Sequence, residues 1–221
     1  MSVGGSLIVP DHIDTEFLHS LRELVLRKVD EGLSFYVIAG GGRLARRYQD
    51  AAKEVLGEWS PHESDWLGIH ATRLNAHLVR ALFAEHASDK IVKNPERMPN
   101  TKYPVIVGGG FRPGNSTDLA AVVAAKKVGA KKVVNLSNID YVYTADPRTN
   151  PDAKKIETIT WPEFRKLLPK EWSPGLSAPF DPVAAKEAQA AGLEVAVING
   201  SKLGELENYL EGSPFVGTVI S

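Results

Sequence analysis

The chain has 221 residues, and its formal net charge is -1 at pH 7. A nearly neutral chain offers no basic field for nucleic acid, and no apolar run approaches the roughly 20 residues that span a bilayer. The absence of cysteine excludes disulfides, thiolate metal sites and cysteine nucleophiles, as suits a reducing compartment. We therefore expect a cytoplasmic protein with small-molecule partners, built as one domain or two closely fused lobes.

Helical and strand patterns alternate along the chain. Apolar residues at helical spacing predict helices over 14–29, 67–86 and 181–191. Short segments rich in β-branched residues predict buried parallel strands at 35–38, 105–107, 132–136 and 194–198. Between 148 and 179 the periodicity breaks, which indicates surface connections and one short helix near 161–168. The alternation predicts an α/β fold with a mainly parallel sheet covered on both faces.

Glycine-rich turns are expected at the carboxyl ends of three strands. They are Gly4-Gly5-Ser6, Gly40-Gly41-Gly42 and Gly108-Gly109-Gly110. Glycine lets backbone amides approach an anion closely, and a helix that follows adds a favourable dipole. One such turn is weak evidence, because many strand-to-helix connections need glycine for structural reasons. Three of them at the edge where parallel sheets bind ligands predict a phosphate-handling site.

The third turn continues into Pro113-Gly114-Asn115-Ser116-Thr117-Asp118 before an alanine-rich segment. Ser116 and Thr117 supply hydroxyls and can cap the helix that this segment predicts. The first helical turn would then direct its positive dipole end at a bound anion. This stretch is the most informative one for a phosphate site.

Several motifs together resemble the amino acid kinase superfamily, and specifically its uridylate kinases. The matching blocks are Gly4-Gly5-Ser6, residues 39–46, residues 65–76, Gly108-Gly109-Gly110 with residues 113–118, residues 137–147, residues 181–185 and residues 217–220. The resemblance extends over essentially the whole chain. The block Ala71-Thr72-Arg73-Leu74-Asn75-Ala76 is similar to the archaeal-type enzymes, whereas the glycine turns would fit any member of the superfamily.

This resemblance implies the amino acid kinase fold, a three-layer αβα sandwich around a mainly parallel sheet. It implies an acceptor (UMP-binding) lobe over 1–129 and an ATP-binding lobe over 130–221. The implied reaction transfers the γ-phosphoryl group of ATP to UMP and gives UDP and ADP, a step of pyrimidine nucleotide biosynthesis. Mg²⁺ would come with ATP and be held mainly by phosphates, with no dedicated metal site in the protein. The family also implies a homohexamer, a trimer of dimers, with no nucleic-acid or membrane partner.

The same resemblance assigns residues to roles. The catalytic residues would be Gly5, Ser6 and Asp118. The ATP-binding residues would be Gly4, Gly5, Ser6, Ser137, Asn138, Asp140, Tyr143 and Asp146. The UMP-binding residues would be Gly41, Gly42, Arg46, Asp65, Thr72, Gly110, Arg112 and Thr117. These types suit the chemistry, because phosphoryl transfer depends on positioning and on neutralising charge.

Individual side chains have matching chemistry. An arginine offers a phosphate paired donors, and a carboxylate such as Asp65 can accept from both ribose hydroxyls. Asp118 is expected to orient the transfer rather than to act as a general base, because a UMP phosphate is already ionised. Thr72 and Asn75 lie one helical turn apart, so both could line the acceptor pocket.

Purely structural roles compete with several of these assignments. Arg46 could belong to a solvated helix face beside Arg43 and Arg47. Asp65 could cap the helix expected from Leu67, and Asp181 could cap the helix that follows it. The acidic residues of the nucleotide loop, Asp140 and Asp146, could simply hold turns. The six scattered histidines predict no metal set.

Three departures from the family pattern keep other functions open. Tyr141 stands where the family usually has glycine, Arg112 adds a positive charge to its loop, and no lysine precedes the first glycine turn. One alternative is a kinase of the same fold that acts on another small carboxylate or phosphate acceptor. The other is a nucleotide-binding protein without turnover. A panel of acceptors separates these functions.

Overall fold

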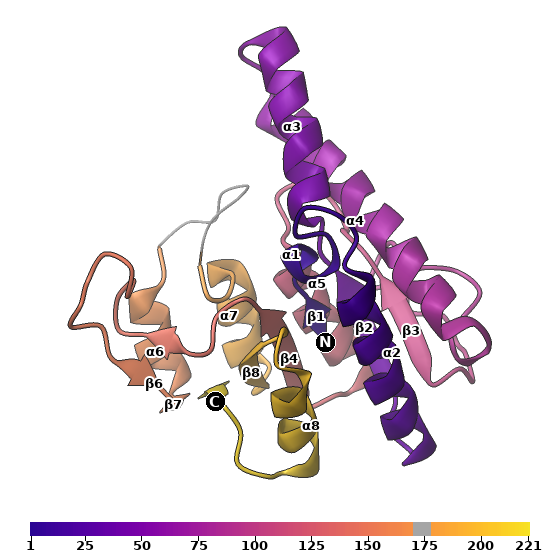
Figure 1. Ribbon diagram of the computed structural model, residues 1–221, viewed down its shortest axis with the longest axis vertical. Helices are drawn as coiled ribbons and strands as arrows, with labels where there is room; N and C mark the ends of the chain where they lie inside the picture. Colours follow the sequence, from indigo (N-terminus) through magenta and orange to yellow (C-terminus); the bar gives the residue numbers. More distant parts are fainter. Residues whose placement is uncertain (170–177) are drawn as a thin grey trace.

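The structure is a computed structural model that describes residues 1–169 and 178–221. Its centre is a seven-stranded sheet with the strand order β3-β2-β1-β4-β8-β9-β7, and helices cover both faces (Figure 1). The strands are β1 Ser2–Val3, β2 Phe35–Ala39, β3 Val105–Gly108, β4 Lys132–Ser137, β7 Thr158–Ile159, β8 Glu194–Asn199 and β9 Gly217–Ile220. Among the described pairs of this sheet, only β8 and β9 run antiparallel. The predicted fold class is confirmed.

Eight α-helices are present in the described parts of the chain. They are α1 Gly5–Ile8, α2 Thr15–Asp30, α3 Gly42–Leu56, α4 Pro61–Phe83, α5 Thr117–Val128, α6 Trp161–Leu167, α7 Pro182–Ala190 and α8 Leu203–Glu211. Side-chain caps begin four of them, α4 among them. In the other three, the carboxylate of Asp14 accepts from Phe17 N, the hydroxyl of Ser116 from Leu119 N, and the carboxylate of Asp181 from Ala184 N. Such caps satisfy amides that have no partner inside the helix. The helices predicted over 14–29, 161–168 and 181–191 are therefore confirmed.

The long helix α4 begins earlier than the sequence pattern predicts. It starts at Pro61 rather than Leu67, with the hydroxyl of Ser60 accepting from His62 N. Proline at the first helical position and serine before it form a strong start signal, because proline has no amide hydrogen that needs a partner there. The alternative role of Asp65 as an N-cap is wrong, since Asp65 lies inside the second turn.

Five elements of the carboxyl-terminal half were not predicted. Helix α8 packs against β8, strand β9 pairs with β8, and the edge strand β7 pairs with β9. A small hairpin pairs β5 Val142–Tyr143 with β6 Lys155–Ile156. The strands among them have two to four residues, too few to establish a period along the sequence. The predicted surface connection before residue 179 lies partly outside the described residues, at 170–177.

The core has one apolar cluster on each face of the sheet. On one face α2, α4 and α8 cover Val37, Val107 and Leu136, and on the other α5, α6 and α7 cover Ile38 and Val195. Strand β1 pairs with both β2 and β4, so the two predicted lobes share one continuous sheet. The division at 129/130 stays a prediction. No helix in the described part of the chain has the length and apolar character needed to cross a membrane.

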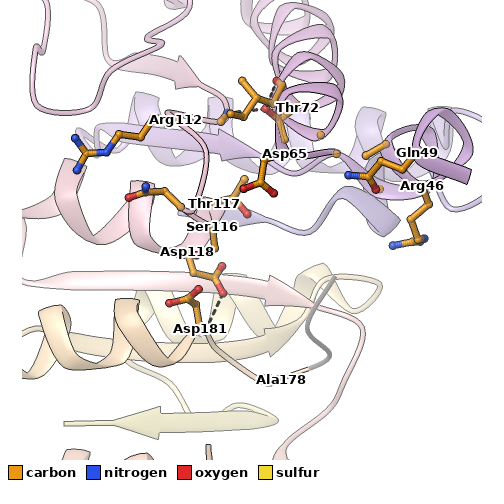
Figure 2. Close-up of a pocket in the computed structure, with 17 residues that line it drawn as sticks. Arg46, Gln49, Asp65, Thr72, Arg112, Ser116, Thr117, Asp118, Ala178 and Asp181 are labelled. Atoms are coloured by element: carbon orange, nitrogen blue, oxygen red, sulfur yellow. Dashed lines mark hydrogen bonds between the residues drawn. The ribbon is translucent and has the colours of Figure 1, made fainter. Parts of the chain in front are cut away.

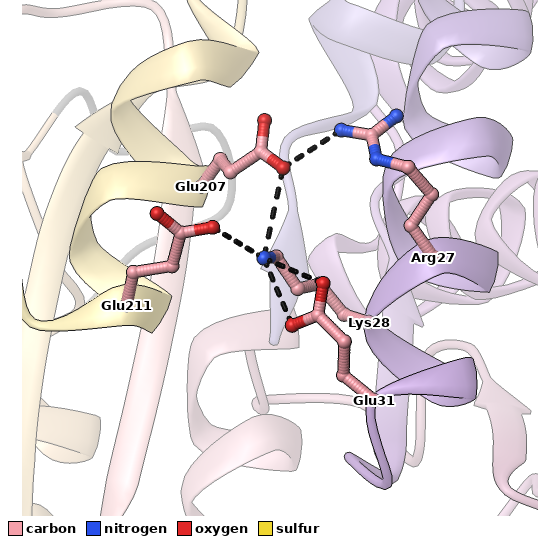
Figure 3. A network of polar contacts seen from close by, with 5 residues as sticks. All are labelled: Arg27, Lys28, Glu31, Glu207 and Glu211. Carbon is pink, nitrogen blue, oxygen red and sulfur yellow. Dashed lines mark hydrogen bonds and ion pairs between the residues drawn. The ribbon is translucent and has the colours of Figure 1, made fainter.

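A buried ammonium group joins α2 to α8 (Figure 3). The side chain of Lys28 is 2% exposed, and its Nζ lies 2.5 Å from Glu211, 3.0 Å from Glu31 and 3.6 Å from Glu207. Hydrogen bonds to Glu211 and Glu31 raise the pKa of Lys28 to about 12. Arg27 donates to Glu207 from the same helix. Because a buried charge is tolerated only when it is paired, this network fixes α8 against α2.

Candidate active site

A cavity of about 320 Å³ lies where α3, α4, the β3–α5 loop and the start of α7 meet (Figure 2). Its wall includes every residue predicted to bind UMP: Gly41, Gly42, Arg46, Asp65, Thr72, Gly110, Arg112 and Thr117. Asp118 and Asp181 also line it. The tertiary structure therefore brings together, from segments far apart in the sequence, the residues that the motifs placed in one site. Their individual roles stay predictions.

The first two glycine turns pack directly on each other, backbone against backbone. A Cβ atom built on Gly5 would lie 1.9 Å from Gly42 N, and one built on Gly42 would lie 2.1 Å from Gly5 O. Gly42 also has φ +62°, a conformation that other residues adopt at a cost. These glycines are therefore required by packing. The contact sets the turn after β1 beside the turn after β2, at one end of the cavity.

Asn75 holds this arrangement from α4. Its side chain is buried, and its Nδ2 donates to Gly40 O at 2.8 Å and to Gly41 O at 3.3 Å. The prediction that Asn75 lines the acceptor pocket is wrong, because its face of α4 is turned toward the end of β2. The side chain instead anchors the glycine turn through the carbonyl groups of Gly40 and Gly41.

Helix α3 carries two polar side chains to the cavity, Arg46 and Gln49. The neighbouring arginines pair with Asp11, at 3.6 Å from Arg43 and 2.6 Å from Arg47. Arg46 makes no ion pair within residues 1–169 and 178–221, and it is exposed at the cavity mouth. The alternative role, a place on a solvated helix face, therefore fits Arg43 and Arg47 better than Arg46, which lines the cavity.

Asp65 and Thr72 fix the loop after β3 from α4. The carboxylate Oδ2 of Asp65 accepts from Gly114 N at 2.7 Å. The hydroxyl of Thr72 donates to Ile69 O at 2.7 Å and accepts from Gly110 N at 2.6 Å. The proton of the Thr72 hydroxyl is thus used internally, so toward a ligand this oxygen could act only as an acceptor. Asp65 keeps a second oxygen for a ligand.

Arg112 lies at the opposite end of the cavity from Arg46, with Asp65 between them (Figure 2). Its guanidinium packs over the ring of Phe111, 4.7 Å from the ring centre. A phosphate bound by Arg46 would therefore lie away from Arg112. The added positive charge of this loop therefore lies at the end of the cavity opposite Arg46.

The floor of the cavity carries a pair of carboxylates, Asp118 and Asp181. Asp118 stands in the first turn of α5; its Oδ1 accepts from Ser2 Oγ at 3.0 Å and its Oδ2 from Asp181 N at 3.3 Å. Burial raises the pKa of Asp118 to about 6, against the opposing hydrogen bond from Ser2. At pH 7 the group is therefore mainly ionised.

The residues predicted to bind ATP lie outside this cavity, after β1 and β4. Gly4 N donates to Leu136 O at 2.9 Å, which places the first glycine turn beside the end of β4. Asp140 accepts from Asn199 Nδ2 at 2.8 Å, and its hydrogen bond with Lys202 is the main cause of its lowered pKa. The segment after β4 is thereby tied to the loop after β8.

Asp146 holds a turn. Its carboxylate accepts from Arg148 through both backbone and side chain, at 2.9 Å and 2.8 Å. These hydrogen bonds favour the structural alternative for Asp146. The ring of Tyr141 lies beneath Lys155, 4.9 Å from its Nζ. The bulky side chain at this position is therefore accommodated against the β5–β6 hairpin.

Within the two described ranges, no group of three or more His, Cys, Asp or Glu side chains could hold a metal ion. The carboxylates that line the cavity are those of Asp65, Asp118 and Asp181, and they do not form such a group. Such a site fits a Mg²⁺ ion that arrives on ATP, because this ion commonly keeps phosphate oxygens and waters as most of its ligands.

The family model described as "Amino acid kinase family" matches residues 1–199. The chain belongs to the amino acid kinase family. Its relatives include the uridylate kinase of Methanocorpusculum labreanum, 33% identical over 224 residues with 100% of this chain and 94% of the relative covered. The uridylate kinase of Pyrococcus abyssi is 35% identical, with 95% and 93% covered. These matches confirm the family that the motifs indicated.

Solved structures agree with this amino acid kinase assignment. The uridylate kinase of Archaeoglobus fulgidus superposes with a TM-score of 0.83 at 29% identity, covering 100% of this chain and 98% of the other. The UMP kinase of Bacillus anthracis, at 19% identity, has a TM-score of 0.70 with 100% and 93% covered, and shows the shared fold. The predicted amino acid kinase fold is confirmed.

Two polar lining residues of this kinase, Gln49 and Asn115, received no role from the sequence. Gln49 follows Arg46 at the i, i+3 spacing that places side chains on one helix face, so its position could have been inferred. Its Nε2 donates to Ser64 O at 2.9 Å, which ties α3 to α4. Asn115 lies within the quoted loop motif, but no spacing rule indicated that it would line the cavity.

Proposed function

We propose that this protein is a uridylate kinase that transfers the γ-phosphoryl group of ATP to UMP. The observation that carries the proposal is one cavity lined by Arg46, a glycine turn and Asp65. In it, Arg46 and the glycine turn could bind a phosphate, and Asp65 could bind the ribose attached to that phosphate. The full-length similarity to archaeal uridylate kinases supports the choice of UMP as acceptor. An oxygen of the UMP phosphate would attack the γ-phosphorus, and the bond to the ADP oxygen would break.

The phosphate of UMP is bound by hydrogen-bond donors at one end of the cavity. Backbone amides of Gly41 and Gly42 and the guanidinium of Arg46 hold the UMP phosphate, since charge-assisted bonds to an anion are the stronger class. The Asp65 carboxylate accepts from the ribose hydroxyls through the oxygen that Gly114 leaves unused. Thr72, Gly110, Thr117 and Arg112 complete the wall. This arrangement would fix the attacking oxygen in line with ATP.

ATP is bound on the other side of the two packed glycine turns. Gly4, Gly5 and Ser6 approach its phosphates, while Ser137, Asn138, Asp140, Tyr143 and Asp146 form the loop for its base and ribose. Mg²⁺ on the ATP phosphates would offset their charge. Asp118 orients the elements that meet between the two substrates and does not act as a general base, because the UMP phosphate is already mostly doubly ionised at neutral pH. Gly5 and Ser6 place donors at the transferred group.

Replacing Asp65 with asparagine tests the ribose contact. The variant is expected to lose UMP turnover by roughly tenfold or more, because a neutral amide is a weaker acceptor than a carboxylate. The assay is ADP release from Mg-ATP with UMP, CMP, AMP, 2′-deoxy-UMP or no acceptor. The ratio of wild-type to variant turnover should be smaller with 2′-deoxy-UMP than with UMP, because 2′-deoxy-UMP lacks one of the hydroxyls that Asp65 would bind.

The same panel decides between the functions left open by the sequence. Turnover with UMP supports the proposal and makes Tyr141 a tolerated substitution. Nucleotide binding without ADP release from any acceptor would contradict it and favour a non-catalytic binder. Turnover only with a small carboxylate or another phosphate acceptor would favour a different kinase of the same fold.

We also propose a homohexamer, built as a trimer of dimers, with α3 in a subunit contact. Tyr48, Val55 and Leu56 on this helix are 59%, 82% and 62% exposed, and α3 extends beyond the sheet (Figure 1). Large apolar side chains grouped on a projecting helix are typical of an interface with a second copy. Light scattering of the Val55→Asp variant is expected to give a smaller particle than the wild type. An unchanged mass would remove α3 from the interface.

We place this activity in the cytoplasm, in pyrimidine nucleotide biosynthesis. The chain has no cysteine, and both proposed substrates are charged metabolites that do not cross membranes unaided. Cell fractionation followed by immunodetection tests the location.

A further inference from the structure

Ser2 is a buried polar residue at the centre of the sheet. It lies on β1 between Ile38 of β2 and Asn135 of β4, and it is 2% exposed. A hydroxyl group at such a place destabilises the fold unless it forms a hydrogen bond. The partner of its Oγ is the Asp118 carboxylate, whose Oδ1 accepts at 3.0 Å. The hydroxyl is therefore directed at the one acidic group that reaches the cavity from α5.

Further hydrogen bonds connect Asp118 of α5 with the start of α7. The second oxygen of Asp118 accepts from Asp181 N at 3.3 Å, and Asp181 Oδ1 accepts from Ala184 N at 2.6 Å to cap α7. Asp118 thus connects the strand that leads into the first glycine turn with the start of α7. In the proposed function, these hydrogen bonds lie beneath the point where the phosphates of ATP and UMP meet.

The donors that hold Asp118 are neutral. In the described part of the chain no Lys, Arg or His lies within ion-pair distance of its carboxylate, and the charged group that faces it is Asp181, which repels it. The first turn of α5 adds a favourable dipole but no fixed direction for the oxygens. Ser2 is the side chain that donates a directional hydrogen bond to Asp118.

We infer that Ser2 is a positioning residue for phosphoryl transfer, whose hydroxyl orients the Asp118 carboxylate so that the first glycine turn, α5 and α7 keep their relative placement at the cavity floor. The inference rests on the proposed function, since it deepens the account of the same site. It assigns a role to a residue outside the cavity wall.

The Ser2→Ala variant should show a specific kinetic change. Loss of one hydrogen bond to a charged group is expected to lower kcat by roughly tenfold, with KM for UMP and ATP changed less than kcat. The wild type should lose activity as the pH falls through about 6, where Asp118 takes up a proton. In Ser2→Ala this acid limb should move to higher pH, because the lost donor stabilised the ionised form. Ser2→Thr keeps the hydroxyl and should keep the wild-type acid limb and most of kcat.

A second buried hydroxyl provides the matched control. Thr218 is 0% exposed, donates to Ile156 O and accepts from Val142 N. Thr218→Val should lower Tm without moving the acid limb. If Ser2→Ala keeps the wild-type kcat and acid limb, or if it only loses kcat in proportion to Tm as Thr218→Val does, the inference is overturned. A wild type without UMP-dependent ADP release would overturn the proposed function itself, which separates the two failures.

Discussion

Replacing Arg46 with alanine is expected to lower kcat/KM for UMP by about a hundredfold to a thousandfold. The free energy of unfolding measured without nucleotide should change little. Arg46 has no ion pair in the described chain, so its removal leaves no unpaired carboxylate behind. Two charge-assisted hydrogen bonds to a phosphate are worth together about 3–4 kcal/mol, which corresponds to that range of rates. Initial rates of ADP release over a UMP concentration series, with thermal unfolding in parallel, measure both quantities.

Arg47 is the matched control for this change. It is one residue away on the same exposed helix, but it pairs with Asp11 at 2.6 Å and does not line the cavity. Arg47→Ala is expected to keep kcat/KM within about threefold of the wild type, because an exposed ion pair is worth about 0–1 kcal/mol. If the two variants lose activity equally, Arg46 is not the phosphate ligand, and the acceptor would have to be held by the glycine turns alone.

The Gly5→Ala variant is expected to lose both stability and activity. The added Cβ would lie 1.9 Å from Gly42 N and 2.6 Å from Gly40 C, and both neighbours are backbone atoms that cannot rotate away. Overpacking of a core costs about 1–3 kcal/mol when side chains can adjust, so we expect a loss of at least about 3 kcal/mol in the free energy of unfolding. Any folded fraction should be inactive, because the two turns would be forced apart. Urea unfolding and ADP release measure the two effects.

Gly204 offers the control for a glycine-to-alanine change as such. It lies in α8, and a Cβ built there has nothing within 4 Å. Gly204→Ala is expected to raise the free energy of unfolding by about 0.5–1 kcal/mol, since glycine is a poor helix former. A Gly5→Ala protein as stable and active as the wild type would show that the turns can separate without loss, and that their contact does not build the site.

Local sequence signals were sufficient for the fold class and much of the architecture. The buried strands at 35–38, 105–107, 132–136 and 194–198 were predicted because β-branched residues between glycines suit a strand buried on both faces. Asp14 and Asp181 begin helices where the pattern expected helices to begin. The antiparallel β9 and the start of α4 were missed. Strand direction depends on which partner is already in place, and a pattern of apolar residues does not contain that information.

The kinds of residue in the site, and their family, were determined by the sequence alone. Glycine turns, an arginine and acidic side chains at characteristic spacings indicate phosphate chemistry. Which of these groups are free to bind a ligand was decided only by the tertiary structure. Asn75 and the Thr72 hydroxyl proton form hydrogen bonds inside the protein, and Ser2 donates to Asp118, 116 positions away. Arg43 and Arg47 share Asp11, while Arg46 has no ion pair among the residues that the structure describes. The physical reason is that a donor or acceptor pairs with a group that lies within about 3 Å of it in the folded protein. Packing between elements far apart in the chain decides which groups lie that close.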